Sequence, residues 1–281
     1  MRKLILGSAQ FGIGYGIYIK CLPISRVKLR EILTLANSSD IDLLDSAINY
    51  QGVASNLASQ PLISKFRIGT KISYTSENEL LILGQLKENQ NQLDIEIYES
   101  ILIHNWSDLS TSEQVKGIDF LYKIRDLGFT KKIGLSVYET QELSGLTRKI
   151  DIIQAPLNYF NLNFLHNSQV SDLKVSGTEF HARSIFHQGT LLHHSNLPRQ
   201  FDAKILRFKE FSKVHGYSYL QSALSIFDSQ VIFSKLVIGV NSKQELSEII
   251  ACPISKSRID LSLISNKFSS DITDPRRWGK N

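Results

Sequence analysis

The sequence is poor in the residue types and patterns that mark disulfide-rich and membrane-spanning proteins. Its 281 residues include only two cysteines, Cys21 and Cys252, and these have neither metal-binding nor redox spacing. No stretch reaches about 18 consecutive apolar residues, so we expect no membrane-spanning helix. The N-terminal segment up to Gly7 is too short for a signal peptide. These absences exclude a disulfide scaffold and predict a cytoplasmic protein with reduced thiols.

Charge of one sign is also scarce. The chain has 32 Lys+Arg against 27 Asp+Glu, a net charge of +5, and no long run of like charges. Three of the cations, Arg276, Arg277 and Lys280, lie in the last six residues. A dedicated nucleic-acid partner is therefore not expected, because such proteins gather Lys and Arg on one face. The 42% hydrophobic content is that of an ordinary globular protein.

Short apolar runs alternate with longer amphipathic segments along the whole chain. The apolar runs predict eight strands, and the segments between them have the periodicity of helices. The expected strands are Lys3–Gly7, Ile41–Asp45, Phe66–Lys71, Tyr98–His104, Lys132–Ser136, Asp151–Gln154, Glu179–His181 and Lys235–Gly239. The expected helices are Arg26–Asn37, Glu77–Gln90, Ser112–Leu127, Glu139–Arg148, Leu162–Val175, Asp202–His215, Ser218–Asp228 and Ser242–Ile250.

This alternation predicts an α/β protein, a closed parallel (β/α)8 TIM barrel that forms one domain over residues 1–281. Ser112 and Ser242 are expected to cap helices, and Ser242 with Glu245 has the spacing of a capping box. A doubly wound open sheet is the rival fold. It requires a glycine-rich turn that opens a helix, whereas the cluster from Gly12 to Gly16 is followed by no helix start.

Four chemically related side chains fall where strands two to four end. The second expected strand ends at Asp45, with Tyr50 in the following loop, the third ends at Lys71, and the fourth ends at His104. Neighbouring strands lie about 4.8 Å apart, so these side chains can meet at the carboxyl end of the barrel. A lysine cation favours the phenolate of a nearby tyrosine. The set therefore suits a general acid that protonates a developing alkoxide.

The same residues carry a resemblance to the aldo-keto reductases. The opening segment Leu4–Gly12 resembles the first strand and turn of that family, Asp45–Tyr50 its Asp-Thr-Ala-x-x-Tyr motif, and Gly69–Lys71 its lysine strand. The resemblance continues through Leu102–His104, Lys132–Ser136, Ile152–Gln154, Gln188–Leu191 and Val237–Ser242. It implies a barrel that transfers hydride from a nicotinamide cofactor to the carbonyl of a small-molecule substrate.

The resemblance also implies a role for each matched residue. Tyr50 would be the acid, Lys71 its activator, Asp45 the partner of Lys71, and His104 the residue that orients the carbonyl. Ser136 and Gln154 would hold the nicotinamide carboxamide, and Ser8 would lie near the ribose. The adenosine phosphate end would meet the segment from Gly239 to Glu248, which includes Ser242 and Lys243. The cofactor expected from the family is NADP(H), with NAD(H) as the alternative.

Several positions depart from the family pattern. After Tyr50 the chain continues Gln51-Gly-Val-Ala-Ser55, where the family usually has Gly-x-Ser-Glu. Val137 replaces a common asparagine, and Arg183 falls where an aromatic ring usually stacks on the nicotinamide. Glu245 replaces an arginine of the 2′-phosphate site and Ile249 an asparagine of the adenine side. A carboxylate at this place weakens the case for NADP(H), although Lys243 could compensate.

Substrate and rival functions are open at this stage. The segment Phe180–Gly189 and the ending Asp274–Trp278 are similar to a bacterial branch found near polysaccharide and sugar biosynthesis genes, which suggests a sugar-like carbonyl. Eight β/α units leave only short loops, so we expect an open pocket. Trp106, two residues past His104, is expected near it. A metal site among His181, His187, His193 and His194 is not expected, because no carboxylate is spaced to join them. A cofactor-binding redox sensor without catalysis is the alternative function.

Overall fold

The computed structural model describes residues 2–12, 24–146, 148–193, 199–254, 259–264, 268, 270–274 and 278. The sequence features at Cys21, Gly14, Gly16 and His194 and the cations Arg276, Arg277 and Lys280 lie outside these residues. Within the described ranges, no helix reaches the length and hydropathy needed to cross a bilayer.

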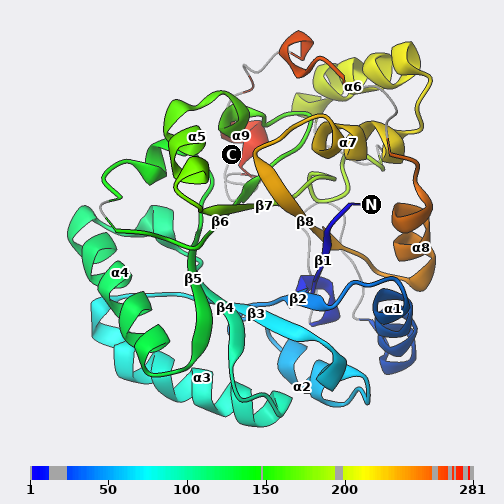
Figure 1. Ribbon diagram of the computed structural model, residues 1–281. Coiled ribbons are helices and arrows are strands. Elements are labelled where there is room, and N and C mark those ends of the chain that lie inside the picture. The colour runs from blue at the N-terminus through cyan, green and yellow to red at the C-terminus, as the bar shows by residue number, and fades with distance from the viewer. Residues whose placement is uncertain are drawn as a thin grey trace.

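Eight parallel strands close into a barrel in sequence order, as the sequence predicts. Figure 1 shows the strands as an inner ring with the helices around it. Both faces of the strands are covered, so most strand residues are buried and apolar. The strands are β1 (Leu4–Gly7), β2 (Leu43–Asp45), β3 (Arg67–Ile72), β4 (Tyr98–Ile103), β5 (Thr130–Ser136), β6 (Ile152–Pro156), β7 (Glu179–Arg183) and β8 (Phe233–Gly239).

The helices bury an apolar stripe against the barrel. In α1 the buried residues Leu29, Ile32, Leu33 and Ala36 follow the spacing of one helical face. The α-helices are α1 (Arg26–Ser38), α2 (Val53–Ala58), α3 (Glu79–Leu93), α4 (Thr111–Asp126), α5 (Ser168–Val175), α6 (Asp202–His215), α7 (Tyr219–Asp228), α8 (Lys243–Ala251) and α9 (Ser270–Thr273).

Helix boundaries differ from the sequence prediction where a local side chain or backbone angle decides. The predicted helix Glu139–Arg148 is wrong, since only a 3-10 turn forms over Thr140–Leu143. Ser144 is extended there and Gly145 has a φ of +79°, which ends the turn. The predicted helix Leu162–Val175 is divided, because the side chain of Asn167 caps a new helix start at α5.

Two caps also differ from expectation. Ser110, not Ser112, caps α4 by accepting a hydrogen bond from the Glu113 N–H. At α8 the Ser242 hydroxyl accepts the Glu245 N–H as predicted. The Glu245 carboxylate, however, accepts the N–H of Asn241 at 2.7 Å, so the reciprocal bond of a capping box is made one residue earlier.

Candidate active site

The four side chains predicted to meet at the strand ends line one cavity of about 720 Å³ at the carboxyl end of the barrel. Asp45 ends β2, Lys71 is the penultimate residue of β3, and His104 directly follows β4. Tyr50 lies in the turn between β2 and α2. Its ring meets that of His104 edge to face, with 6.1 Å between the centroids. The structure thus brings these four residues together in the wall of one cavity.

An ion pair connects two of them. The Lys71 ammonium donates to Asp45 Oδ2 at 2.5 Å and to the Ser46 carbonyl at 3.1 Å. Asp45 Oδ1 accepts a second hydrogen bond, from the Gln154 amide at 2.9 Å. Burial lowers the pKa of Lys71 below its ordinary value, although Asp45 acts in the opposite direction. The Lys71 cation is therefore buried away from water and held by Asp45, and the Asp45 carboxylate is held in turn by Gln154.

A second polar cluster lies deeper in the barrel, where β7 points Glu179 and His181 inward. The Glu179 carboxylate contacts the His181 ring at 3.2 Å, Lys235 at 2.7 Å, and also Lys132. The hydrogen bond with His181 is the largest influence that lowers the pKa of Glu179. Burial lowers the pKa of His181. Charged groups thus replace the apolar side chains that usually fill a barrel interior.

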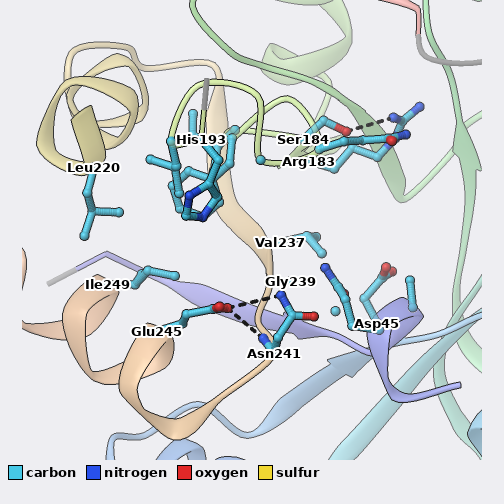
Figure 2. A pocket seen from close by; sticks show the side chains of 18 of the residues that line it. Asp45, Arg183, Ser184, His193, Leu220, Val237, Gly239, Asn241, Glu245 and Ile249 are labelled. Carbon is cyan, nitrogen blue, oxygen red and sulfur yellow. Dashed lines mark hydrogen bonds between the residues drawn. The ribbon is translucent and has the colours of Figure 1, made fainter. Parts of the chain in front are cut away.

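The β5 and β7 side of the cavity carries Arg183 and Tyr138. The guanidinium carbon of Arg183 lies 4.0 Å from the centre of the Tyr138 ring. Its Nη2 donates to the Val137 carbonyl at 3.0 Å, and its Nη1 lies 3.4 Å from the Ser184 hydroxyl. Figure 2 shows Arg183 and Ser184 together on one side of the cavity. Arg183, one of the positions that depart from the family pattern, is therefore part of the cavity wall.

The opposite end of the cavity is lined by the start of α8. The Glu245 carboxylate accepts hydrogen bonds from the backbone and side-chain nitrogens of Asn241, as Figure 2 shows. Glu248 and Ser242 also line the cavity. Lys243 is exposed and is not one of the lining residues. Two carboxylates, with no lysine from α8, therefore face this end.

The remaining predicted cofactor residues differ in how they reach the cavity. Ser136, Gln154 and Gly239 line it. Ser8 is fully buried and does not line the cavity, although its neighbours Gly7, Ala9 and Gln10 line it. Trp106, expected near the site, is buried with its indole N–H on the Glu142 carbonyl, and it is not in the wall.

The loop after β7 completes the wall in a constrained backbone conformation. Ser184, His187 and Gln188 have positive φ values of 60°, 50° and 53°, which non-glycine residues seldom adopt. The buried His187 ring holds this loop by bonding the Thr190 hydroxyl and the Ile272 carbonyl, each at 2.7 Å. The C-terminal segment thus supports a strained loop beside the cavity.

Some lining residues were not singled out from the sequence. Tyr138 lies two residues beyond Ser136, and Gln10 lies three residues beyond Gly7, so both follow a strand end. Asn241 lies inside the segment predicted to meet the phosphate end. The strand-end rule could have identified all three, but nothing in the sequence shows that Arg183 stacks on Tyr138 or that Glu245 binds Asn241.

Metal chemistry finds no support among the described side chains. No three His, Cys, Asp or Glu residues in the ranges that the structure covers lie close enough together to hold a metal ion. His181 and His187 instead bond to Glu179 and Thr190 respectively.

Comparisons with known proteins agree with the fold and show the family. The family model described as Aldo/keto reductase family matches residues 3–260. The aldo-keto reductase AKR11C1 from Bacillus halodurans, in its holo form, is 14% identical over 98% of this chain and 95% of its own, with a TM-score of 0.74. A protein from Pseudomonas aeruginosa provisionally named an aldo-keto reductase is 15% identical over 89% and 88%, with a TM-score of 0.66. No curated protein matches the chain.

Proposed function

The chain belongs to the aldo/keto reductase family, a family of oxidoreductases, and from that premise we propose that it reduces the carbonyl of a small molecule to an alcohol with a reduced nicotinamide cofactor. The observation that carries the proposal is the presence of Asp45, Tyr50, Lys71 and His104 in the wall of one cavity. A phenol, an ammonium, a carboxylate and an imidazole are the groups needed to protonate an alkoxide as it forms.

Each of the four has a distinct task in this proposal. The cofactor, when bound, supplies the hydride that adds to the carbonyl carbon. Tyr50 gives its phenolic proton to the carbonyl oxygen, and the Lys71 cation stabilises the phenolate that remains. Asp45 holds Lys71 in place through the 2.5 Å ion pair. His104 orients the carbonyl by hydrogen bonding to its oxygen.

The residues around the cavity fit a nicotinamide dinucleotide. The Ser136 hydroxyl and the Asn241 side-chain carbonyl are buried without a hydrogen-bond partner among the described residues. Both residues line the cavity, Ser136 beside the four reactive residues and Asn241 beside α8. Ser136 and Gln154 would hold the carboxamide, while Gly239 and Ser242 would approach the phosphates at the α8 N-terminus. Unpaired polar atoms at both ends support an elongated polar ligand.

The α8 end of the cavity favours NADH for this chain. Glu245 and Glu248 line it, and the lysine that could offset them, Lys243, does not. A carboxylate repels a 2′-phosphate but accepts hydrogen bonds from a ribose diol. The preference for NADP(H) expected from the family resemblance is therefore replaced, in our proposal, by one for NAD(H).

The substrate we propose is a sugar-sized, hydroxylated carbonyl compound. Polar side chains that can bond hydroxyl groups, Gln188 and His193, line the cavity beyond the reactive residues. Aromatic rings of Tyr138 and Tyr219 are also in the wall, and rings commonly pack on sugar faces.

A direct test is turnover with a broad set of aldehydes and ketones. Purified protein should oxidise NADH when a sugar-sized carbonyl is supplied, and the alcohol should be recovered in equal amount. Binding of NADH with no turnover across the set would instead favour the redox-sensor alternative. Faster reduction of two- or three-carbon aldehydes than of sugars would contradict the substrate class but not the chemistry.

A further inference from the structure

Arg183 is a cation in the cavity wall that no described carboxylate neutralises. Its guanidinium contacts a backbone carbonyl, a hydroxyl and the Tyr138 ring. No Asp or Glu among the residues that the structure describes lies within ion-pair distance of it. Lys71, by contrast, has its charge balanced by Asp45. The Arg183 side of the cavity therefore carries an uncompensated positive charge.

The position of this charge is fixed by its surroundings. The Tyr138 ring covers one face of the guanidinium at 4.0 Å, and the Val137 carbonyl accepts Nη2 at 3.0 Å. Arg183 Nε is buried and unpartnered, which keeps the group poorly screened by water. Arg183 also contributes to the lowered pKa of Lys71, after burial and against the effect of Asp45. Its field thus extends to the reactive end of the cavity.

The hydride donor must lie close to Arg183 if the proposed function holds. Tyr50 and His104, which would bind the carbonyl, come from the β2 and β4 side of the barrel. The facing wall consists of Ser136, Gln154 and Arg183, on the neighbouring strands β5, β6 and β7. A ring that delivers hydride to a carbonyl on Tyr50 has to occupy the space between these two walls.

The oxidised and reduced cofactors differ in charge at this ring only. The oxidised nicotinamide is a cation and the reduced ring is neutral, whereas the phosphates and riboses are the same in both. A fixed cation beside the ring therefore disfavours the oxidised form specifically. We propose that Arg183 makes this chain bind the reduced cofactor selectively, so that the free enzyme takes up NADH in preference to NAD⁺ and releases NAD⁺ readily after turnover. The inference rests on the proposed function and adds which form of the cofactor the site selects.

The test compares the dissociation constants of NAD⁺ and NADH, measured by titration calorimetry. Wild-type protein should bind NADH at least about tenfold more tightly than NAD⁺. Arg183→Met keeps the side-chain length but removes the charge. It should lower the ratio of the NAD⁺ to the NADH dissociation constant by about tenfold, mainly through tighter binding of NAD⁺. Arg183→Lys should keep the wild-type ratio.

Arg148→Met provides a matched control. The Arg148 guanidinium also stacks on a tyrosine, 3.6 Å from the centre of the Tyr122 ring, but it is paired with Asp119 and does not line the cavity. Its removal should leave the NAD⁺ to NADH ratio unchanged. Thermal unfolding of each variant verifies that it is folded.

Three outcomes would overturn the inference. Dissociation constants of both cofactor forms that are unchanged in Arg183→Met show that the charge does not act on the ring. Dissociation constants that rise by the same factor for both forms show that Arg183 only shapes the wall. An unchanged ratio with a raised KM for carboxylate-bearing carbonyls alone assigns Arg183 to the substrate. If neither NADH nor NAD⁺ binds, the proposed function fails as well, which separates the two claims.

Discussion

Lys71 and Asp45 form a 2.5 Å ion pair in a cavity wall, with the lysine buried and the carboxylate half-buried. The pair ties the end of β2 to β3, and Gln154 on β6 holds the second carboxylate oxygen from across the barrel. The reactive end of the site is thus built by long-range contacts between strands. Substitutions that remove a single charged group should therefore change measurable properties of the protein, such as its pH profile, its cofactor preference or its stability.

The first prediction concerns the pH dependence of reduction. Burial lowers the pKa of Lys71 from 10.5, and our mechanism needs its charged form. The kcat/KM for carbonyl reduction should therefore fall as pH rises, with a midpoint below 10.5. Asp45→Asn removes the group that raises this pKa, so the midpoint should move further down. A profile that is flat up to pH 10.5 in both proteins would exclude Lys71 from the mechanism.

The second prediction concerns cofactor choice at α8. Glu245→Gln keeps an acceptor for the Asn241 N–H but removes the negative charge. The ratio of kcat/KM for NADH to that for NADPH should fall by about tenfold, because repulsion of the 2′-phosphate is lost. Glu88→Gln, at an exposed position on α3, serves as the control and should leave the ratio unchanged. A wild-type preference for NADPH would refute the assignment.

The third prediction is acid sensitivity through His187. Burial lowers the pKa of this ring from 6.5 to about 4, so the folded protein favours the neutral imidazole. Stability from this residue is complete above about pH 6.5 and is lost as pH falls toward 4, on the order of 2–3 kcal/mol.

The measurement is the free energy of unfolding between pH 4 and 7, by denaturant titration. His187→Phe should flatten the slope over this range and lower stability at neutral pH, because the Thr190 and Ile272 contacts are lost. The exposed His215 gives a control in His215→Gln, which should retain the wild-type slope. An unchanged slope in His187→Phe would disprove the role of this ring.

The fourth prediction concerns the polar cluster inside the barrel. Glu179→Gln leaves Lys132 and Lys235 without their shared carboxylate. Because the cluster is partly exposed, we expect a loss of about 1–3 kcal/mol in unfolding free energy. Adding Lys235→Met to Glu179→Gln should recover part of the loss, which a double-mutant cycle measures. Strict additivity would show that the two groups do not interact.

The strands and the reactive residues could be predicted because their signals are local. Apolar runs such as Leu4–Gly7 recur at the β/α spacing, and strand ends in a barrel share one face. Asp45, Lys71 and His104, at or beside strand ends, line the same cavity in the structure. By contrast, α2 is only six residues long and follows Gly52 at a φ of +77°, so it has too few residues to show a helical period.

Details of the wall depend on contacts between distant segments. Arg183 and Tyr138 are 45 positions apart, and His187 bonds Ile272 from the end of the chain. Ser8 matches the family pattern, yet it is buried and does not line the cavity, whereas Ala9 and Gln10 of the following turn do. Such outcomes are set by packing between strands and loops, which no local pattern in the sequence encodes.

The central claim, that Tyr50 is the proton donor of a carbonyl reductase, is tested most directly by single-turnover kinetics. NADH bound to excess protein is mixed with a sugar-sized carbonyl, and loss of its absorbance is followed in wild type and Tyr50→Phe, with the NADH dissociation constant measured for both. Our account predicts a rate at least about 10²-fold lower in Tyr50→Phe with NADH binding retained. Equal single-turnover rates in the two proteins would contradict it.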